Sequence, residues 1–292
     1  MIDSQYESLF LDILNDNVSP KAKLISSRPV SGGDINQAAR METSTGVWFA
    51  KWNQADVFPG MFEAEARGLQ LLKQAGVLYV PEVKGYGEKQ NVSMLVLEFV
   101  EQGREKKNFW QHFGAGLAAL HKHTNDMFGL DHDNYIGSLP QINKRTDNWE
   151  EFFTVYRLEQ QIRLVRDKSL MDSATSRQFE KLFTRLGEFF PREKPSLLHG
   201  DLWSGNFMTN SRGEACIIDP AVYYGHRLMD IGMSKLFGGF APEFYQAYHS
   251  AFPLEDNWQQ AVEIANLYPL LVHVNLFAGS YMGSVKSILK RF

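Results

Sequence analysis

Cysteine is almost absent from this chain of 292 residues, in which Cys216 is the single example. One cysteine excludes an intramolecular disulfide and a zinc site built from cysteines. Because Cys216 lies within the apolar run 215–218, we expect a buried and unreactive thiol. The spacing of metal ligands that is typical of zinc sites is missing throughout the sequence.

Long hydrophobic runs and a strong charge of one sign are also missing. The longest apolar region, 268–282, is interrupted by His273 and Asn275 and is too short to span a bilayer. The N-terminus lacks a basic segment followed by an apolar one, so we expect no signal peptide. A formal net charge of −4 gives no reason to expect a nucleic-acid or membrane partner. These absences favour a soluble, cytoplasmic protein.

Short apolar strands and turns alternate in the first third of the chain. The pattern predicts an amphipathic helix up to Asn17, strands at 24–30, 37–42 and 47–52, a helix at 62–74 and a strand at 92–100. Composition then becomes polar and charged through Lys107. We therefore expect an α+β protein with two lobes: an antiparallel, β-rich lobe with one helix at 1–100, and a larger, mainly helical lobe at 101–292.

Helix signals continue through the second lobe. Asp147 precedes Trp149, and Glu150 follows in the arrangement of a capping box, which predicts a helix start. Apolar residues from Phe179 to Phe190 follow helical spacing and stop before Pro191. We assign these aromatic stripes to the core.

The segment 198–230 carries the clearest functional signal. A polar loop, His199-Gly200-Asp201, is followed by Asn206, and the short apolar strand 215–218 ends directly in Asp219. Phosphoryl transfer needs such a set: one carboxylate to orient the attacking hydroxyl, and an amide with a second carboxylate to hold Mg²⁺. The five-residue offset between Asp201 and Asn206 matches the protein-kinase catalytic loop. The alternative is a surface turn rich in Asp and Asn.

The motifs LLHGDLWSGN and IDPAVYYGHRLMDIGM resemble those of the fructosamine-3-kinase (ketosamine-3-kinase) family. Trp203 and the run DPAxYYGHRxxD distinguish this family from the wider group of aminoglycoside phosphotransferases and choline kinases. The resemblance extends from about residue 31 to about residue 281. It implies a two-lobed, protein-kinase-like fold, with a nucleotide-binding lobe at 1–100 and a catalytic, acceptor-binding lobe at 101–292.

The resemblance implies a role for each residue of the polar motif. Asp201 is the catalytic carboxylate that accepts the proton of the substrate hydroxyl. Asn206 and Asp219 are the Mg²⁺ ligands, since hard oxygen donors suit this ion. His199 and Asp230 are structural residues that brace the loop.

The resemblance also assigns the nucleotide contacts. Lys51 contacts the α- and β-phosphates of ATP and is oriented by Glu65, with Glu63 as the competing partner on another face of the helix. A strand-end lysine reaching solvent is the alternative for Lys51.

Two further segments complete the nucleotide site. Gly32 and Gly33 allow backbone amides to approach phosphate, although a simple hairpin turn is the alternative, and Asp34 is an unfavourable neighbour for an anion. Backbone groups of Glu98 and Val100 hold adenine in this reading.

Trp203 and His273 are the candidate acceptor-binding residues, and Asn275 and Tyr281 are further candidates on the same late segment. An aromatic face suits both the C–H face of a sugar and a protonated amine. Packing beneath the loop is the alternative for Trp203. His121 and His123 lie near the end of a predicted helix, so we expect them to be solvated.

The resulting hypothesis is an ATP- and Mg²⁺-dependent kinase that phosphorylates the C3 hydroxyl of a ketosamine and thereby initiates deglycation. The acceptor is a small-molecule ketosamine or a glycated amine, with no nucleic-acid or membrane partner. The first alternative is an aminoglycoside or choline phosphotransferase of the same fold. The second is a non-catalytic, kinase-like binding module. Such a module typically lacks one of the catalytic residues, whereas this chain has all four: Asp201, Asn206, Asp219 and Lys51. The sequence leaves the oligomeric state open.

Overall fold

The computed structural model describes residues 3–18, 20–30, 35–256, 258–278 and 280–292. Two compact units make up the chain. Unit 1 comprises Met1–Phe109 and the returning segment Met208–Asp219, and unit 2 comprises Trp110–Phe207 and Pro220–Phe292. Unit 1 thus continues past the predicted division at residue 100 to Phe109, and it also includes the twelve residues of the segment 208–219.

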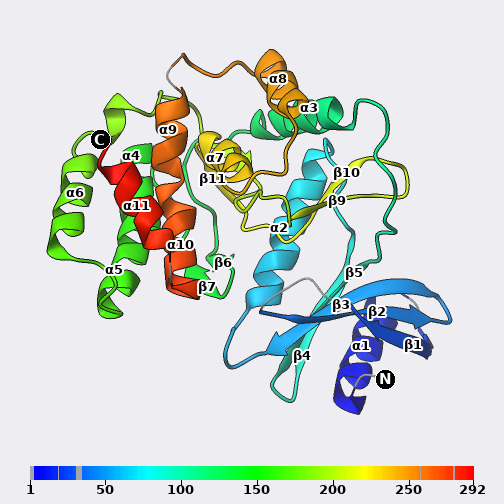
Figure 1. Cartoon of the computed structure of the whole chain (residues 1–292). Helices are drawn as coiled ribbons and strands as arrows, with labels where there is room; N and C mark the ends of the chain where they lie inside the picture. The colour runs from blue at the N-terminus through cyan, green and yellow to red at the C-terminus, as the bar shows by residue number, and fades with distance from the viewer. Residues whose placement is uncertain (1–2, 19, 31–34, 257, 279) are drawn as a thin grey trace. The chain divides into compact units, whose positions relative to one another are not determined.

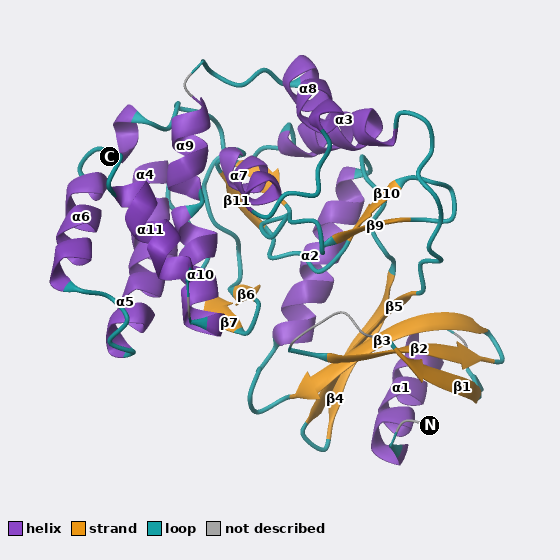
Figure 2. Cartoon of the chain, viewed as in Figure 1, coloured by secondary structure: helices purple, strands orange, loops and turns teal. Residues whose placement is uncertain are grey.

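Unit 1 is built around one antiparallel sheet (Figures 1 and 2). The strand order is β1-β2-β3-β5-β4, with β1 at Leu24–Pro29, β2 at Gln37–Thr43, β3 at Gly46–Gln54, β5 at Val92–Glu98 and β4 at Val83–Lys89. Strand β3 is central and pairs with both β2 and β5, so Lys51 lies opposite Ala38 and Leu95. The segment 208–219 adds β10 (Ala215–Ile217), which pairs with β9 (Phe207–Thr209).

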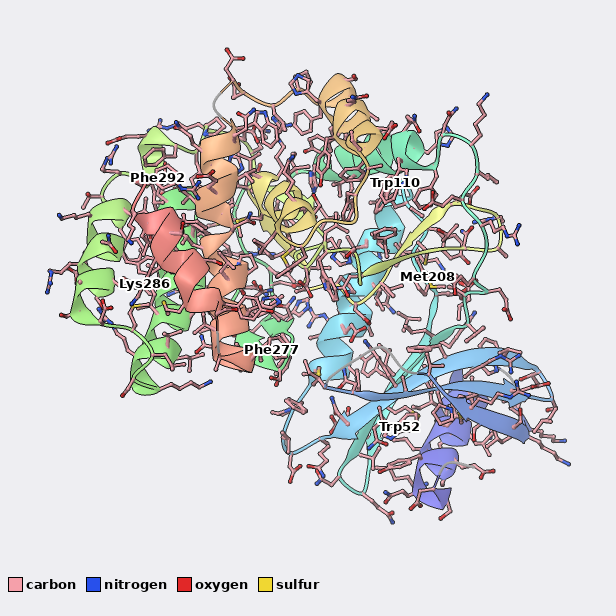
Figure 3. All side chains as sticks on the ribbon, in the orientation of Figure 1. Trp52, Trp110, Met208, Phe277, Lys286 and Phe292 are labelled. Atoms are coloured by element: carbon pink, nitrogen blue, oxygen red, sulfur yellow. The ribbon has the colours of Figure 1, made fainter. Side chains whose placement is uncertain are left out.

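Among the described residues, unit 1 contains two helices, at the two places where the apolar spacing predicts them. Helix α1 (Ser4–Asn17) starts at Asp3, whose carboxylate accepts from the Gln5 amide, and its buried stripe joins the core that includes Trp52 (Figure 3). Helix α2 (Met61–Ala75) is bounded by Gly60 and Gly76, both left-handed. It carries Glu65.

Unit 2 is mainly helical. Its helices are α3 (Phe109–His121), α4 (Trp149–Phe153), the π-helix η1 (Thr154–Leu158), α5 (Glu159–Asp167), α6 (Ser173–Phe183), the 3₁₀-helix η2 (Leu186–Glu188), α7 (Leu228–Leu236), α8 (Pro242–Ala251), α9 (Trp258–Ala265), α10 (Leu267–Phe277) and α11 (Tyr281–Leu289). Two small hairpin-like pairs complete it: β6 (Asn134–Ile136) with β7 (Leu139–Gln141), and β8 (Ser196–Leu198) with β11 (Tyr223–Gly225).

Two local predictions in unit 2 were wrong. The cap of α4 is Asn148 rather than Asp147, because the Asn148 side chain accepts from the Glu151 amide at 2.7 Å. The helix predicted up to Phe190 ends at Phe183, since Arg185 leaves helical geometry (φ −120°, ψ 1°). Leu186 is still buried in the following 3₁₀ turn, so the apolar spacing continues although the α-helix does not.

Within the described residues, none of the helices combines the length and the apolar character needed to cross a membrane. Cys216 is a free, fully buried thiol, and burial raises its pKa to about 12. The prediction that Cys216 is buried is confirmed.

Candidate active site

Lys51 forms the centre of a buried charge cluster in unit 1. Its side chain is directed away from solvent on the central strand β3, and the residue is 5% exposed. The ammonium Nζ lies 2.5 Å from Glu65 Oε1 and 2.7 Å from Asp219 Oδ1. The predicted pairing with Glu65 is therefore present, whereas Glu63 is exposed. The solvated, strand-end alternative for Lys51 is wrong.

Burial and charge pairing oppose each other in this cluster. Burial alone would lower the pKa of Lys51, but Asp219 and Glu65 raise that pKa above its ordinary value. Burial raises the pKa of Glu65 to about 7, although the Lys51 ammonium acts to lower it. Lys51 is thus held as a cation, a state suited to contact with an anionic group.

Asp219 reaches Lys51 through an unusual backbone conformation. It follows β10 and has φ +51°, in the left-handed region that residues other than glycine rarely adopt. Its side chain is 47% exposed, in contrast to the enclosed Lys51 and Glu65. Strain of this kind persists where surrounding contacts hold it and is frequent at functional sites.

The residues assigned to adenine lie at the end of β5. The Glu98 amide donates to the Glu82 carbonyl at 2.8 Å, and the Glu98 carboxylate accepts from the Tyr79 hydroxyl. These bonds fix the end of the strand, and Val100 follows two residues later. The other predicted nucleotide contacts, Gly32 and Gly33, lie outside the described residues, as does Asp34.

The polar loop of unit 2 brings two predicted residues together. The amide nitrogen Nδ2 of Asn206 donates to the Asp201 carbonyl and to the Asp201 carboxylate, both at 2.9 Å. Gly200, between His199 and Asp201, has φ +84°, and a Cβ there would lie 2.0 Å from the Ala221 carbonyl oxygen. Only glycine allows this close approach of the two chain segments.

Asp230 braces the same loop from helix α7. Its carboxylate accepts from the His199 amide at 2.8 Å and from the Gly200 amide at 2.9 Å. Burial alone would raise the pKa of Asp230, but hydrogen bonding and charge from His121 and the backbone bond from Gly200 hold it below its ordinary value. This geometry agrees with the structural role expected for Asp230 and His199.

His121 is a participant that sequence reasoning missed. The expectation of a solvated side chain was wrong for His121, which is fully buried, although His123 is exposed. His121 Nε2 lies 3.1 Å from the Asp230 carboxylate, and Nδ1 lies 2.8 Å from the Tyr248 hydroxyl. Its position four residues after the buried Leu117 on α3 is the sequence signal that places it on the inward face.

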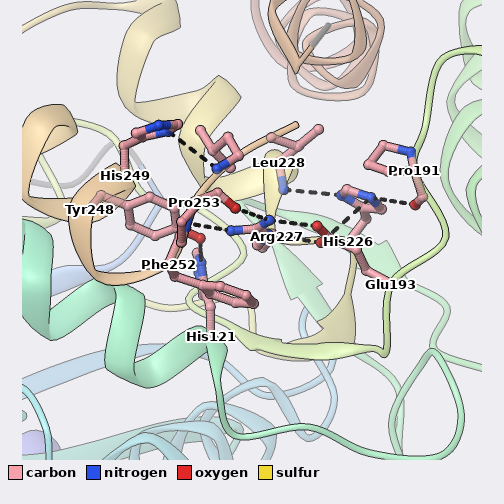
Figure 4. Close-up of polar contacts among 11 residues, drawn as sticks. His121, Pro191, Glu193, His226, Arg227, Leu228, Tyr248, His249, Phe252 and Pro253 are labelled. Atoms are coloured by element: carbon pink, nitrogen blue, oxygen red, sulfur yellow. Dashed lines mark hydrogen bonds and ion pairs between the residues drawn. The ribbon is translucent and has the colours of Figure 1, made fainter. Parts of the chain in front are cut away.

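The histidine and arginine of the GHR motif anchor the start of α7 (Figure 4). Arg227 donates to both oxygens of Glu193, at 2.8 and 2.5 Å, and to the carbonyls of Phe252 and Pro253. His226 Nε2 lies 3.1 Å from the Pro191 carbonyl, and burial lowers the pKa of His226 to about 4. These contacts hold the helix that carries Asp230.

A hollow opens beside Asp201 within unit 2. It is lined by Ile136, Gly200, Asp201, Met229, Met233, Tyr268, Pro269, Val272 and His273. Among these described residues, Asp201 is the one carboxylate. The walls are otherwise apolar or aromatic, as is typical of a small-molecule site.

His273 connects this hollow to a cluster of aromatic rings. Its ring centroid lies 4.7 Å from that of Phe237, 5.0 Å from Tyr281 and 5.6 Å from Phe277, which Figure 3 labels at the end of α10. Nδ1 lies 2.7 Å from the Pro269 carbonyl, so this nitrogen carries the proton. Burial lowers the pKa of His273, which keeps the ring neutral at pH 7.

The remaining acceptor candidates divide into two groups. Trp203 is 38% exposed, its ring centroid lies 6.2 Å from that of Phe237, and its ring lies against Gly205 of the same loop, so packing against the loop remains the alternative to a substrate contact. It joins the hollow through Phe237 and His273 rather than lining it. Asn275 is buried and donates to the backbone and side chain of Gln161, which is a structural connection between α10 and α5.

Comparison with known proteins identifies relatives over almost the whole chain. A family model described as fructosamine kinase matches residues 8–292. A Synechocystis protein described as a ketoamine kinase is 41% identical over 90% of this chain and 89% of its own length. The chloroplastic protein-ribulosamine 3-kinase of Arabidopsis thaliana is 38% identical over 89% of this chain and 80% of its own length.

Two solved structures are similar to this chain in fold. A structure from Haemophilus somnus 129PT, described as a fructosamine-3-kinase, has a TM-score of 0.88 and 28% identity over 97% of this chain and 96% of the other. Aminoglycoside phosphotransferase APH(4)-Ia has a TM-score of 0.62 and 14% identity over 97% of this chain and 98% of its own. The prediction of a two-lobed, α+β, kinase-like fold is confirmed.

Proposed function

Because the chain belongs to the fructosamine kinase family, we propose that it transfers the γ-phosphoryl group of ATP to the C3 hydroxyl of a ketosamine. The observation that carries this proposal is the pairing of Lys51 with Glu65 and Asp219 in one unit, together with the Asp201–Asn206 pair in the other. Every protein group required for phosphoryl transfer is present in these two sets.

Unit 1 binds the nucleotide in this proposal. The Lys51 ammonium, held charged by its carboxylate neighbours, contacts the α- and β-phosphates, and Glu65 limits its position. The carbonyl of Glu98 and the amide of Val100 bind adenine, since the Glu98 amide is already bonded within the sheet. Gly32 and Gly33 contribute backbone amides to the phosphates.

Asn206 and Asp219 would hold the Mg²⁺ that accompanies ATP. Their donors fit this ion: one amide oxygen and one carboxylate leave most of the octahedral positions for phosphate and water. The described residues contain no group of three or more His, Cys, Asp and Glu side chains that could hold a metal. When bound, Mg²⁺ supplies charge neutralisation on the phosphates.

Asp201 positions the acceptor. Its carboxylate lies in the wall of the hollow and is oriented by Asn206, so it can accept a hydrogen bond from the attacking C3 hydroxyl. A carboxylate is a weak base towards an alcohol, so orientation and charge placement are the main contributions of Asp201. His273 lines the sugar site, and Trp203 contacts the amine-bearing part of the acceptor from the aromatic cluster.

Phosphorylation at C3 has a chemical consequence for the product. The C1–C2 enaminol of the ketosamine expels phosphate from C3, and hydrolysis of the resulting conjugate then releases the amine. The protein thus initiates deglycation without cleaving the C–N bond. The proposal includes a cytoplasmic location, where ATP is available, and a ketosamine as a small molecule or attached to a larger amine.

The hollow disfavours the related aminoglycoside reaction. An aminoglycoside carries several cationic groups and is recognised by several carboxylates, whereas Asp201 is the one carboxylate among the described residues that line the hollow. Aromatic and apolar walls fit the less charged ketosamine.

The proposal is tested by measuring ADP release with MgATP and a panel of acceptors. The panel comprises fructosamines, ribulosamines and erythrulosamines of free lysine, with an aminoglycoside and choline as matched controls. We expect turnover with at least one ketosamine and none above background with the controls. Turnover with a control alone would retain the kinase assignment and overturn the acceptor class.

A further inference from the structure

Arg157 is a buried cation that the proposed chemistry does not use. Its residue is 0% exposed. The guanidinium donates from Nη1 to the Ile142 and Tyr156 carbonyls, at 2.7 and 2.9 Å, and from Nη2 to Asn143 Oδ1 at 2.7 Å. Burying a charge in this way is costly, so its partners are tightly constrained.

Aromatic faces offset part of that cost. The guanidinium carbon of Arg157 lies 4.0 Å from the ring centroid of Tyr223, 4.5 Å from Phe152 and 5.5 Å from Tyr268. A guanidinium stacks on ring faces and donates in its own plane at the same time, which an ammonium cannot do. Arg157 therefore contacts aromatic rings of α4, β11 and α10 while it also forms hydrogen bonds.

A local helix irregularity places this side chain. Arg157 lies in the π-helix η1, which interrupts the helical run between α4 and α5. The π-helix widens the turn and changes the phase of the side chains, and both Arg157 and Leu158 are fully buried. Such irregularities are frequent at functional sites.

A chain of side-chain amides extends from Arg157. We define the amide ladder as Asn143, Asn134 and Gln141, on and beside the β6–β7 pair. Asn143 Nδ2 and Gln141 Nε2 both donate to Asn134 Oδ1 at 2.8 Å. The ladder ends at Gln141 Oε1, which accepts from the Tyr268 hydroxyl at 2.7 Å.

The ladder also holds the backbone that follows Asp219. Asn134 Nδ2 donates to the Val222 carbonyl at 2.8 Å, and Gln141 Nε2 donates to the Ala221 carbonyl at 3.1 Å. The Ala221 amide in turn donates to the His199 carbonyl at 2.9 Å. The ladder thus reaches both the catalytic loop and the wall residue Tyr268.

We propose that Arg157 and the amide ladder are positioning residues that set the shape of the acceptor hollow through Tyr268 and the segment 221–222. This inference rests on the proposed function in one respect, that the hollow lined by Tyr268 and Asp201 takes the ketosamine. The hydrogen bonds of the amide ladder are directional, so they restrict the positions of Tyr268 and of the segment 221–222 more than apolar packing does. Acceptor binding, rather than ATP binding, depends on it.

Tyr268→Phe tests the end of the network with the smallest change. It keeps the ring in the wall of the hollow and removes the hydroxyl that binds Gln141. We expect the KM for the ketosamine to rise roughly fivefold to tenfold, the factor that corresponds to a buried hydrogen bond, with the KM for ATP unchanged. Tyr245→Phe, which removes a hydroxyl bonded to Ser234 outside the ladder, is the matched control and leaves both values unchanged.

Arg157→Lys tests the other end, because it keeps the charge and removes the planar donor set. We expect the same selective rise in the KM for the ketosamine. In the double variant with Tyr268→Phe, we expect the fold-increase in this KM to be smaller than the product of the two single fold-increases. If the wild-type protein turns over a ketosamine, either of two results overturns the inference: an unchanged ketosamine KM in Tyr268→Phe, or a double variant whose KM rises by the full product of the two single effects. A wild-type protein inactive on every ketosamine overturns the proposed function, and this inference with it.

Discussion

At the scale of single residues, two side chains share the central roles. Asp201 lies in the wall of the hollow proposed for the acceptor and is bonded to Asn206, whereas Lys51 is enclosed with Glu65 and Asp219. The spacing of the polar motif predicts Asp201, Asn206 and Asp219 because phosphoryl transfer requires these residue types at the ends of short elements. The family resemblance predicts the pairing of Lys51 with Glu65. Their separate chemical roles give separate kinetic predictions.

Asp201→Asn keeps the size of the side chain and removes the negative charge that orients the hydroxyl. We expect kcat to fall by about 10²–10⁴, with the KM for ATP and the melting temperature nearly unchanged. Steady-state kinetics with saturating ketosamine measure this. Retention of about a third of wild-type kcat would show that Asp201 is not the orienting carboxylate.

Lys51→Ala should raise the KM for ATP and lower kcat, since it removes the cation that contacts the phosphates. Glu65→Gln should reproduce part of the loss, because Lys51 then keeps only Asp219 as a charged partner. Glu63→Gln is the matched control on the same helix and should have little effect. A larger loss in the Glu63 variant would contradict the assigned orientation of α2.

At the scale of secondary-structure elements, helix ends bring the catalytic loop into place. Helix α7 presents Asp230 to the loop amides, and α3 supplies His121 behind it. The sequence predicted the helix that ends near His121 but not this connection, because His121 and Asp230 are 109 residues apart and no local spacing records their meeting.

His121→Phe should reduce kcat roughly tenfold by leaving the buried Asp230 carboxylate with one partner fewer, a loss that is worth about 1–3 kcal/mol. We expect the KM for ATP to stay unchanged, since the loop and not the nucleotide site is affected. His123→Phe, at an exposed position two residues later, is the control. Equal kinetics for the two variants would remove His121 from the positioning network.

At the scale of the whole molecule, some features can be predicted from the sequence and others can be seen only in the structure. The motifs were sufficient to predict the kinase-like fold and the Lys51–Glu65 pairing. They were insufficient for the end of α6 at Phe183 and the cap at Asn148, which depend on backbone geometry. Buried polar groups such as His226 then determine how stability responds to pH.

His226 makes the folded protein sensitive to acid. Burial lowers its pKa from 6.5 to about 4, so between these values the unfolded chain binds a proton that the folded protein does not. Its contribution to stability is therefore present above about pH 6.5 and is lost as the pH falls towards 4, at a slope of up to about 1.4 kcal/mol per pH unit. Denaturant unfolding at several pH values measures this slope. It should be shallower in His226→Gln and unchanged in His123→Gln, and an unchanged slope in the first variant would contradict the assignment.

The most direct test of the central claim is ³¹P NMR of the reaction with MgATP and a ketosamine that the protein turns over. Phosphoryl transfer to C3 predicts a new phosphomonoester resonance coupled to the C3 proton. After the protein is removed, that resonance should decline while inorganic phosphate and free amine appear together. A phosphoester at another carbon, or a C3 ester from which no amine is released, would contradict the account.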